Sequence, residues 1–378
     1  MLKKMRKNVA LLLSAVLLLG YLTGCSGTKP ANPAETPGAS TPAATREIVD
    51  MQGNTVTIPT EVNKIAVTSW KGAFGSLILL GQLDKVAVMA DVARYTWLNQ
   101  AFPQIKDIPN YGSFNDVNVE ELLDANLDII ISPEQAADAN KKMQDLKMPV
   151  YVDGITPADD KSVLAVAQAE INAMADVTGT KDVADAYYKW QNDLLAEIEK
   201  RVATIPEGER KTALVVRTTM DEVFCENISL GYGVILAGGK LATEGINQYY
   251  TKVDPEEIVK WNPDFIFQQI VTSPYGEEMA QFYNNWKKDE RYKNLTAVKN
   301  GDCYIMPMGI VQWSGDIEFA QGVLLMAKMM YPEVFADMDV KKYAEEFYQK
   351  FLGYTMTDAD WKVMAPNFAG AKTTGLSQ

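Results

Sequence analysis

The stretch from Thr180 to Ile205 reads TKDVADAYYKWQNDLLAEIEKRVATI and carries a sustained helical pattern. Its apolar residues recur at steps of three and four: Val183, Tyr187, Trp190, Leu194, Ile198, Val202 and Ile205. This spacing predicts one long amphipathic helix. Thr180 stands at the N-cap position, Lys200 and Arg201 place positive charge in the last turn, and Pro206 follows. At about 1.5 Å per residue such a helix is roughly 35 Å long, enough to bridge two lobes.

Two similar segments lie on either side of this helix. Residues 118–131 read NVEELLDANLDIII and residues 254–267 read DPEEIVKWNPDFIF. Aligned without a gap, they match at Glu120 with Glu256, Asn126 with Asn262 and Asp128 with Asp264. Each segment predicts a short helix, a turn and a buried strand. Two copies with the same internal spacing predict two similar α/β lobes joined by the long helix.

The rest of the chain fits this division. Strand patterns alternate with helical patterns after an opening β-hairpin at residues 46–59, which predicts an α/β fold of two mainly parallel lobes. We therefore predict an N-terminal lobe at residues 46–179, an interlobe helix at 180–206 and a C-terminal lobe at 207–378.

The N-terminus reads as a targeting segment. Positive residues precede a short apolar run that ends in the sequence LTGC, residues 22–25. This resembles the lipobox of a bacterial lipoprotein, which implies a signal peptide at residues 1–24 and a lipid on Cys25. The alternative is an ordinary signal peptide with a coincidental cysteine. Residues 25–45 have no apolar periodicity, and their content of proline, alanine and threonine predicts a flexible tether.

Composition excludes several functions. The formal net charge of −13 argues against nucleic acid as a partner. The chain has no histidine, which rules out Ser-His-Asp and Cys-His catalysis and imidazole-based metal sites. No motif pairs carboxylates for catalysis, so we predict a binding protein without a cofactor and not an enzyme. Besides Cys25 the cysteines are Cys225 and Cys303, for which a disulfide and two buried free thiols both remain open.

These features together resemble one family across residues 46–355: LTGC, REIVDMQGNTVTIP, KIAV, the two repeated segments and the long helix. The family is the class III periplasmic binding proteins, the substrate-binding lipoproteins of bacterial ABC importers for iron–siderophores, haem and corrinoids. The resemblance implies a cleft between two lobes, a rigid connecting helix, and Glu120 and Glu256 as the residues that dock the permease subunits. Their neighbours Glu121 and Glu257 fit the role equally well, and all four fit a purely structural role as acids at helix starts.

The ligand site is predicted from geometry. Ligands of parallel α/β sheets bind outside the carboxyl ends of the strands. Cationic and aromatic residues near those predicted ends are Trp70, Lys71, Arg94, Tyr95, Trp97, Tyr111, Arg217, Tyr249 and Trp313. Each aromatic taken singly also fits a role in packing.

Aromatic faces with a few cations suit a bulky, partly apolar, anionic ligand. A ferric siderophore is therefore the predicted ligand, with a corrinoid, haem or a molybdate-type oxyanion as alternatives. The predicted protein is a monomer, held at the outer face of the cytoplasmic membrane by its lipid alone.

Overall fold

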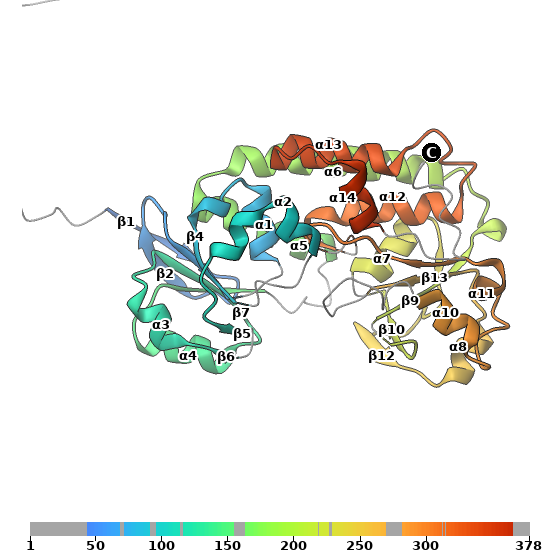
Figure 1. The fold of residues 1–378 in the computed structure, drawn as a ribbon, viewed down its shortest axis with the longest axis horizontal. Helices are drawn as coiled ribbons and strands as arrows, with labels where there is room; N and C mark the ends of the chain where they lie inside the picture. Colours follow the sequence, from blue (N-terminus) through green and yellow to red (C-terminus); the bar gives the residue numbers. More distant parts are fainter. Residues whose placement is uncertain are drawn as a thin grey trace, which may run out of the picture. The chain divides into compact units, whose positions relative to one another are not determined.

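The computed structural model describes residues 44–365, apart from 69–71, 91–95, 114–115, 155–162, 218, 227–228, 270–281, 312 and 314 (Figure 1). The predicted signal peptide, Cys25 and most of the tether lie outside the described residues. Within the described residues no helix is long and apolar enough to span a membrane.

The first lobe is built on a parallel sheet. Among the described residues this sheet has four strands in the order β4-β3-β7-β8, and each neighbouring pair is parallel. Its strands are β3 (Ile65–Val67), β4 (Val86–Met89), β7 (Ile129–Pro133) and β8 (Val150–Asp153). The predicted opening hairpin is confirmed as the antiparallel pair β1 (Thr45–Val49) and β2 (Thr55–Pro59). A small antiparallel pair is formed by β5 (Gly112–Ser113) and β6 (Asp116–Val117).

Helices of the first lobe follow or precede these strands. They are α1 (Ala73–Leu79), α2 (Thr96–Ala101), α3 (Val119–Asp124), α4 (Ala137–Asp145) and α5 (Val163–Thr178), with 3-10 turns η1 (Leu83–Lys85) and η2 (Pro103–Asp107). The three strands β3, β7 and β8 are buried along their whole length, because helices cover both faces of the sheet.

The second lobe contains a mixed sheet. In the part of the chain that the structure describes it has six strands, ordered β12-β10-β9-β13-β14, with β11 also paired to β9. The pairs of β9 with β11 and β13, and of β13 with β14, are parallel, whereas β10 is antiparallel to both its neighbours. The strands are β9 (Thr212–Val216), β10 (Glu222–Phe224), β11 (Lys240–Leu241), β12 (Tyr250–Lys252), β13 (Phe265–Gln268) and β14 (Cys303–Ile305).

Further helices complete the second lobe. They are α7 (Ser229–Leu236), α8 (Pro255–Trp261), α10 (Phe282–Lys288), α11 (Thr296–Asn300), α12 (Phe319–Met330), α13 (Val340–Leu352) and α14 (Asp358–Met364), with η3 (Glu207–Glu209) and η4 (Asp316–Glu318). The mainly parallel α/β fold predicted for both lobes is thus confirmed.

The predicted long helix is α6 (Lys181–Val202), which leads from the first lobe to the second. Thr180 occupies its N-cap position, but the Thr180 hydroxyl bonds the Thr178 hydroxyl at 2.8 Å instead of capping the helix. The predicted apolar stripe is buried at Tyr187 and three later positions, and the stripe also buries Gln191. Gln191 is accommodated because its Nε2 donates to the Tyr187 hydroxyl at 2.7 Å.

The repeated segments have a structural explanation. Asn126 and Asn262 both adopt the left-handed conformation, with φ of 50° and 42°, directly after their helices α3 and α8. Two residues later, the Asp128 carboxylate accepts from the backbone N–H of Lys64 at 2.9 Å, next to β3. The Asp264 carboxylate accepts from the N–H of Thr212, at the start of β9, also at 2.9 Å. Each Asn-x-Asp unit therefore ends a helix and anchors the start of a neighbouring strand.

The two lobes have more than one connection. Figure 1 places α6 and α13 side by side, and aromatic pairs join them, with ring centroids 6.4 Å apart for Tyr187 and Phe347 and 5.9 Å for Trp190 and Phe351. The last helix, α14, contacts α2 of the first lobe, where the Trp97 indole N–H donates to Asp360 at 3.2 Å. The boundaries at 179 and 206 stay a prediction, since this C-terminal connection crosses between the lobes.

Candidate ligand-binding and docking sites

The carboxyl ends of the first lobe's strands present polar groups. The Thr68 hydroxyl, just after β3, donates to the Ser132 hydroxyl of β7 at 3.0 Å. Glu134 directly follows β7, and its carboxylate accepts from the Gln52 side-chain amide at 3.0 Å. The same amide donates to the carbonyl of Gly154, after β8, at 2.8 Å. The turn of the opening hairpin therefore holds Glu134 at the edge of the sheet where ligands of parallel α/β folds bind.

At the matching edge of the second lobe, Arg217 directly follows β9. Its guanidinium lies 4.8 Å from the centre of the Tyr250 ring, and its Nη1 lies 3.5 Å from the Glu222 carboxylate. Its backbone carbonyl accepts from the Gln268 amide at 3.0 Å. Since the Arg217 side chain keeps 31% of its surface exposed, it combines a fixed position with access to solvent.

Two tyrosines extend this surface. Tyr249 and Tyr250 are 41% and 48% exposed, which is unusual for large aromatic side chains. The Tyr250 ring also packs edge-on against Phe224 at 6.4 Å. The pKa of Tyr249 is raised by its partial burial and, next, by the carboxylate of Glu134. Glu134 directly follows β7, so this carboxylate comes from the first lobe.

The predicted ligand residues divide into three groups. Trp70, Lys71, Arg94 and Tyr95 lie outside the described residues. Arg217 lies against the ring of Tyr250, and Tyr249 is the residue that precedes Tyr250. Tyr111 is half-buried and packs against the core on one face of the first sheet. Sequence reasoning missed Glu222 as the partner of Arg217, although an acid five residues after an Arg, across a short turn between strands, is an available signal.

Trp97 and Trp313 require a correction. They are 1% and 0% exposed and belong to the hydrophobic core. Their indole N–H groups are engaged internally, Trp97 with Asp360 at 3.2 Å and Trp313 with the Tyr348 hydroxyl at 3.3 Å. Neither side chain offers a surface to a ligand, so we remove both from the proposed ligand-contact set.

Comparison with known proteins identifies the family. The family model described as "Periplasmic binding protein" matches residues 65–308, which is more than half of the chain.

The chain belongs to the periplasmic binding protein family.

Relatives of this periplasmic binding protein have different named ligands. The "Molybdate-binding protein MolA" of Haemophilus influenzae is 24% identical over 82% of this chain and 91% of its own length. The "Probable siderophore-binding lipoprotein YfiY" of Bacillus subtilis is 22% identical over 85% of this chain and 97% of its own length. A periplasmic solute binding protein of Veillonella parvula has the same fold, with a TM-score of 0.71 at 20% identity over 85% and 97% of the two chains.

Membership and the fold together make the chain a solute-binding protein of the kind that serves ABC transporters. The named relatives are solute-binding proteins and not enzymes. Within the described residues, no group of three or more His, Cys, Asp or Glu side chains is arranged to hold a metal ion.

Both described cysteines of this periplasmic binding protein are buried free thiols, the second of the two alternatives that the sequence left open. Burial raises the pKa of Cys225 and of Cys303. They therefore resist deprotonation and the reactions that depend on a thiolate.

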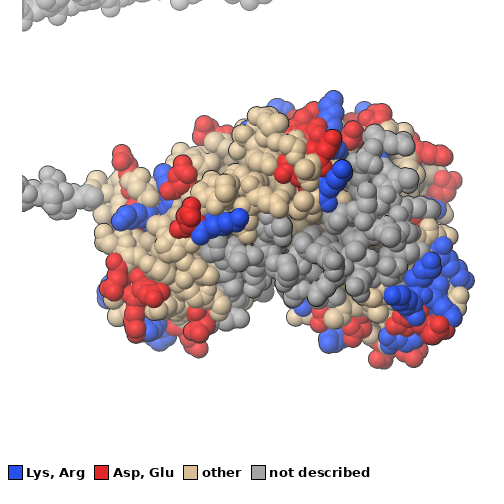
Figure 2. All heavy atoms as spheres, in the orientation of Figure 1, with Lys and Arg blue, Asp and Glu red and all other residues tan. Residues whose placement is uncertain are grey.

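The predicted docking glutamates are on the surface. The Glu120 side chain is 86% exposed and lies 3.6 Å from the Lys142 ammonium, while Glu256 is exposed at the start of α8. Figure 2 shows acidic side chains over α3 of the first lobe, and basic side chains around α10 of the second with acidic ones beside them. Exposure leaves both glutamates accessible to a partner, and their docking role stays a prediction.

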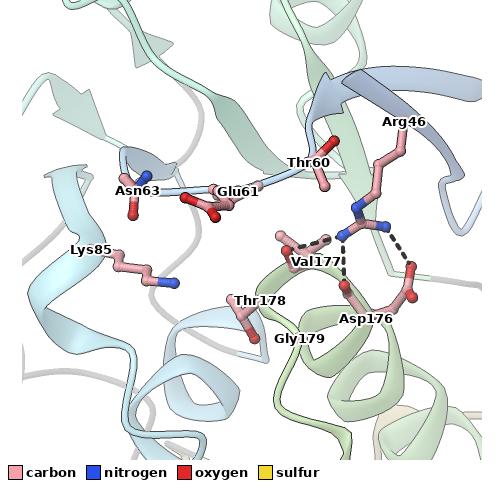
Figure 3. Close-up of a pocket in the computed structure, with 10 residues that line it drawn as sticks. Arg46, Thr60, Glu61, Asn63, Lys85, Asp176, Val177, Thr178 and Gly179 are labelled. Atoms are coloured by element: carbon pink, nitrogen blue, oxygen red, sulfur yellow. Dashed lines mark hydrogen bonds and ion pairs between the residues drawn. The ribbon is translucent and has the colours of Figure 1, made fainter. Parts of the chain in front are cut away.

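Two hollows lie at the opposite edge of the first sheet. One has a volume of about 370 Å³ and is drawn in Figure 3. Its wall includes residues that precede β3 and β4, so it lies at the amino ends of these strands. There Arg46 donates to the carbonyls of Asp176 and Val177, at 2.6 and 3.1 Å, and so caps the end of α5. The second hollow, about 640 Å³, borders Asp128 and Pro149, which precede β7 and β8. Neither is at the carboxyl ends of the strands.

Proposed function

We propose that this periplasmic binding protein captures a ferric siderophore outside the cytoplasmic membrane and delivers it to an ABC importer. The proposal rests above all on the surface formed by Arg217, which follows β9, and by Tyr249 and Tyr250 at the start of β12. A ferric siderophore is bulky, partly apolar and often anionic. It can therefore stack on exposed tyrosine rings while the Arg217 guanidinium pairs with its negative charge.

A molybdate-type oxyanion is the second candidate, because a relative bears the name of a molybdate-binding protein. The surroundings of Arg217 count against it. The Glu222 carboxylate, 3.5 Å away, already offsets the guanidinium charge, and the face of the guanidinium covers the Tyr250 ring. A small oxyanion needs several free donors, and it makes no use of two exposed tyrosines. Corrinoid also suits aromatic surfaces but leaves the arginine without a role. Haem would need a tyrosine, or no side chain, to hold its iron in a chain without histidine.

The ligand class is testable by titration. Purified protein is titrated with ferrioxamine B, a ferric catecholate, cobalamin, haem and molybdate, and the quenching of tryptophan fluorescence is followed. We expect tight binding, at micromolar concentration or below, for a ferric siderophore. Arg217→Ala should weaken it about tenfold, the size expected for loss of about 1.4 kcal/mol of charge and stacking interactions.

Arg291→Ala is a matched control. Arg291 also lies over a tyrosine ring, 5.0 Å from the centre of Tyr292, and pairs with Asp289 at 2.7 Å. Its contacts are with Tyr292 and Asp289 and not with the Tyr249 and Tyr250 rings, so its removal should leave affinity unchanged. Tight binding of molybdate or cobalamin, with none of either siderophore, would show that the proposed ligand is wrong.

For delivery, we propose that Glu120 and Glu256 bind basic pockets on the two permease subunits. Charges held on separate lobes can report how the lobes are placed relative to each other, and exposed charges mainly govern association and specificity. Glu120→Ala or Glu256→Ala should each slow uptake about tenfold in vesicles that contain the reconstituted importer. Ligand affinity should stay the same, because the proposed docking role uses only the exposed charge of each residue.

Glu121→Ala and Glu257→Ala serve as controls for this prediction, since they remove the same charge one residue later. If these variants stop uptake and the first pair does not, the docking residues have been assigned to the wrong positions. Loss of ligand affinity with intact docking would place Glu120 and Glu256 on the ligand side instead.

For localisation, we propose that Cys25 is lipidated after removal of residues 1–24 and that residues 25–45 tether the two lobes to the membrane. The LTGC sequence and the composition of the tether support this arrangement. We further propose that the protein acts as a monomer, with the permease and the ligand as its partners.

A further inference from the structure

A buried tyrosine in α13 organises the segment that follows the last strand of the second lobe. Tyr348 is 0% exposed, its hydroxyl donates to the Glu318 carboxylate, and it accepts from the indole N–H of Trp313 at 3.3 Å. The same carboxylate accepts from the backbone N–H groups of Ile310 and Val311, at 3.2 and 2.9 Å. Tyr348 and Glu318 thus hold the described residues 307–311 and 313, which follow β14 and are called the 307–313 segment below.

The ring of Tyr348 also contacts the first lobe. Its centroid lies 5.0 Å from that of Trp97, the second residue of α2, with the planes tilted by 50°. On its other side Trp97 meets the ring of Tyr354 edge-on at 5.6 Å and donates to Asp360 at 3.2 Å. Asp360 is itself fixed, because it also accepts from the Tyr354 hydroxyl at 2.9 Å. One side chain of α13 therefore contacts α2 in one lobe and the 307–313 segment in the other.

We propose that Tyr348 is a positioning residue that couples α2 of the first lobe to the 307–313 segment of the second, and so sets the geometry of the ligand site without contacting the ligand. The part concerning the ligand rests on the proposed function. Both segments follow strands at their carboxyl ends, β4 and β14, the edge where ligands of this fold class bind. The proposal also assigns a role to Trp97 and Trp313, whose burial excludes direct contact with a ligand.

Physical coupling follows from the kind of contact. A hydroxyl that donates to one group and accepts from another links the two hydrogen bonds, and buried networks of this type respond as a unit. The ring contact transmits a displacement to Trp97, because close-packed interiors do not deform gradually. Tyr348→Phe keeps the ring but removes one hydrogen bond from Glu318 and one from Trp313. We therefore expect α2 and the 307–313 segment to lose protection from amide hydrogen exchange together.

The first test measures amide hydrogen exchange in the protein without ligand. In Tyr348→Phe, exchange should accelerate about tenfold both at 96–101 in α2 and at 307–311. The control is Tyr331→Phe, which removes a comparable buried hydroxyl that accepts from the Lys211 N–H at 2.9 Å and donates to the Gly238 carbonyl at 2.8 Å. This control should leave both segments unchanged. Faster exchange at 307–311 alone, or equal acceleration in Tyr331→Phe, would overturn the coupling.

The second test is the affinity for the anionic ferric catecholate, with molybdate in parallel, below the temperature at which any variant unfolds. Tyr348→Phe should lower the affinity for the ligand about tenfold, and Tyr331→Phe should leave the affinity unchanged. Equal weakening in the two variants indicates a general loss of stability and contradicts the positioning role. If neither probe binds the unmodified protein, the ferric siderophore and oxyanion assignments fail, while the exchange experiment still decides the coupling.

Discussion

Replacement of Glu318 by alanine is expected to lower the free energy of unfolding by about 3–5 kcal/mol, measured by urea denaturation. Glu318 is 0% exposed and accepts hydrogen bonds from two backbone N–H groups and from Tyr348. Alanine leaves these three donors without that acceptor in the interior, and each such loss costs about 1–3 kcal/mol. These donors belong to the 307–313 segment and to α13. The variant should therefore also open the contact between these two elements to solvent.

A control on α13 separates burial from charge. Glu346 is exposed, so Glu346→Ala removes the same charge without disturbing a buried acceptor. We expect its effect to stay within about 0.5 kcal/mol, as for most surface substitutions. A loss below about 1 kcal/mol for Glu318→Ala would contradict the role of the carboxylate as an internal acceptor.

Replacement of Gly322 by alanine should destabilise the protein by about 3 kcal/mol, although alanine normally favours a helix over glycine by about 1 kcal/mol. Gly322 lies within α12, and a Cβ atom there would stand 1.7 Å from the backbone oxygen of Trp313. The 307–313 segment is not free to move away, because Glu318 and Tyr348 hold it by hydrogen bonds at Ile310, Val311 and Trp313. The free energy of unfolding from urea denaturation gives the sign of the effect.

Gly75 provides the matched control. It also lies within a helix, α1, and packs on the same segment, but the nearest atom to its added Cβ would be a Val311 methyl carbon at 3.5 Å. That is an ordinary contact, so Gly75→Ala should be neutral or stabilising by up to about 1 kcal/mol. Destabilisation by both variants to the same extent would mean that close approach of the segment is not the cause.

Much of the architecture could be read from local patterns. The apolar stripe of α6 predicted a buried face that the structure confirms at Tyr187, Leu194, Ile198 and Val202. The repeated Asn-x-Asp units predicted two similar lobes, because a left-handed asparagine and a strand-anchoring aspartate are local requirements that recur wherever the same helix–strand junction is built. Such features depend on residues that are close in sequence, so they can be predicted from a single sequence.

The candidate ligand site was predictable only in part. Arg217 directly follows β9, as the strand pattern predicts, and Tyr249 directly precedes β12; the part of both residues in ligand binding stays a prediction. The same reasoning could not tell these residues from Trp97 and Trp313, which occupy equivalent positions along the chain. An aromatic residue after a strand can turn outward or inward, and its own neighbours in sequence do not decide which.

The sequence by itself determined the fold class, the long helix and the repeated junctions, since periodicity records which side of an element is buried. Only the tertiary structure decided what each buried side meets. Trp97 is buried because Asp360, 263 residues later in the chain, accepts its indole proton, and because Tyr348 covers its ring. Tyr249 and Tyr250 keep 41% and 48% of their surface exposed, although Arg217 and Phe224 contact the Tyr250 ring. The physical reason is that burial of a side chain after a strand depends on contacts between elements distant in sequence, and no local pattern encodes those contacts.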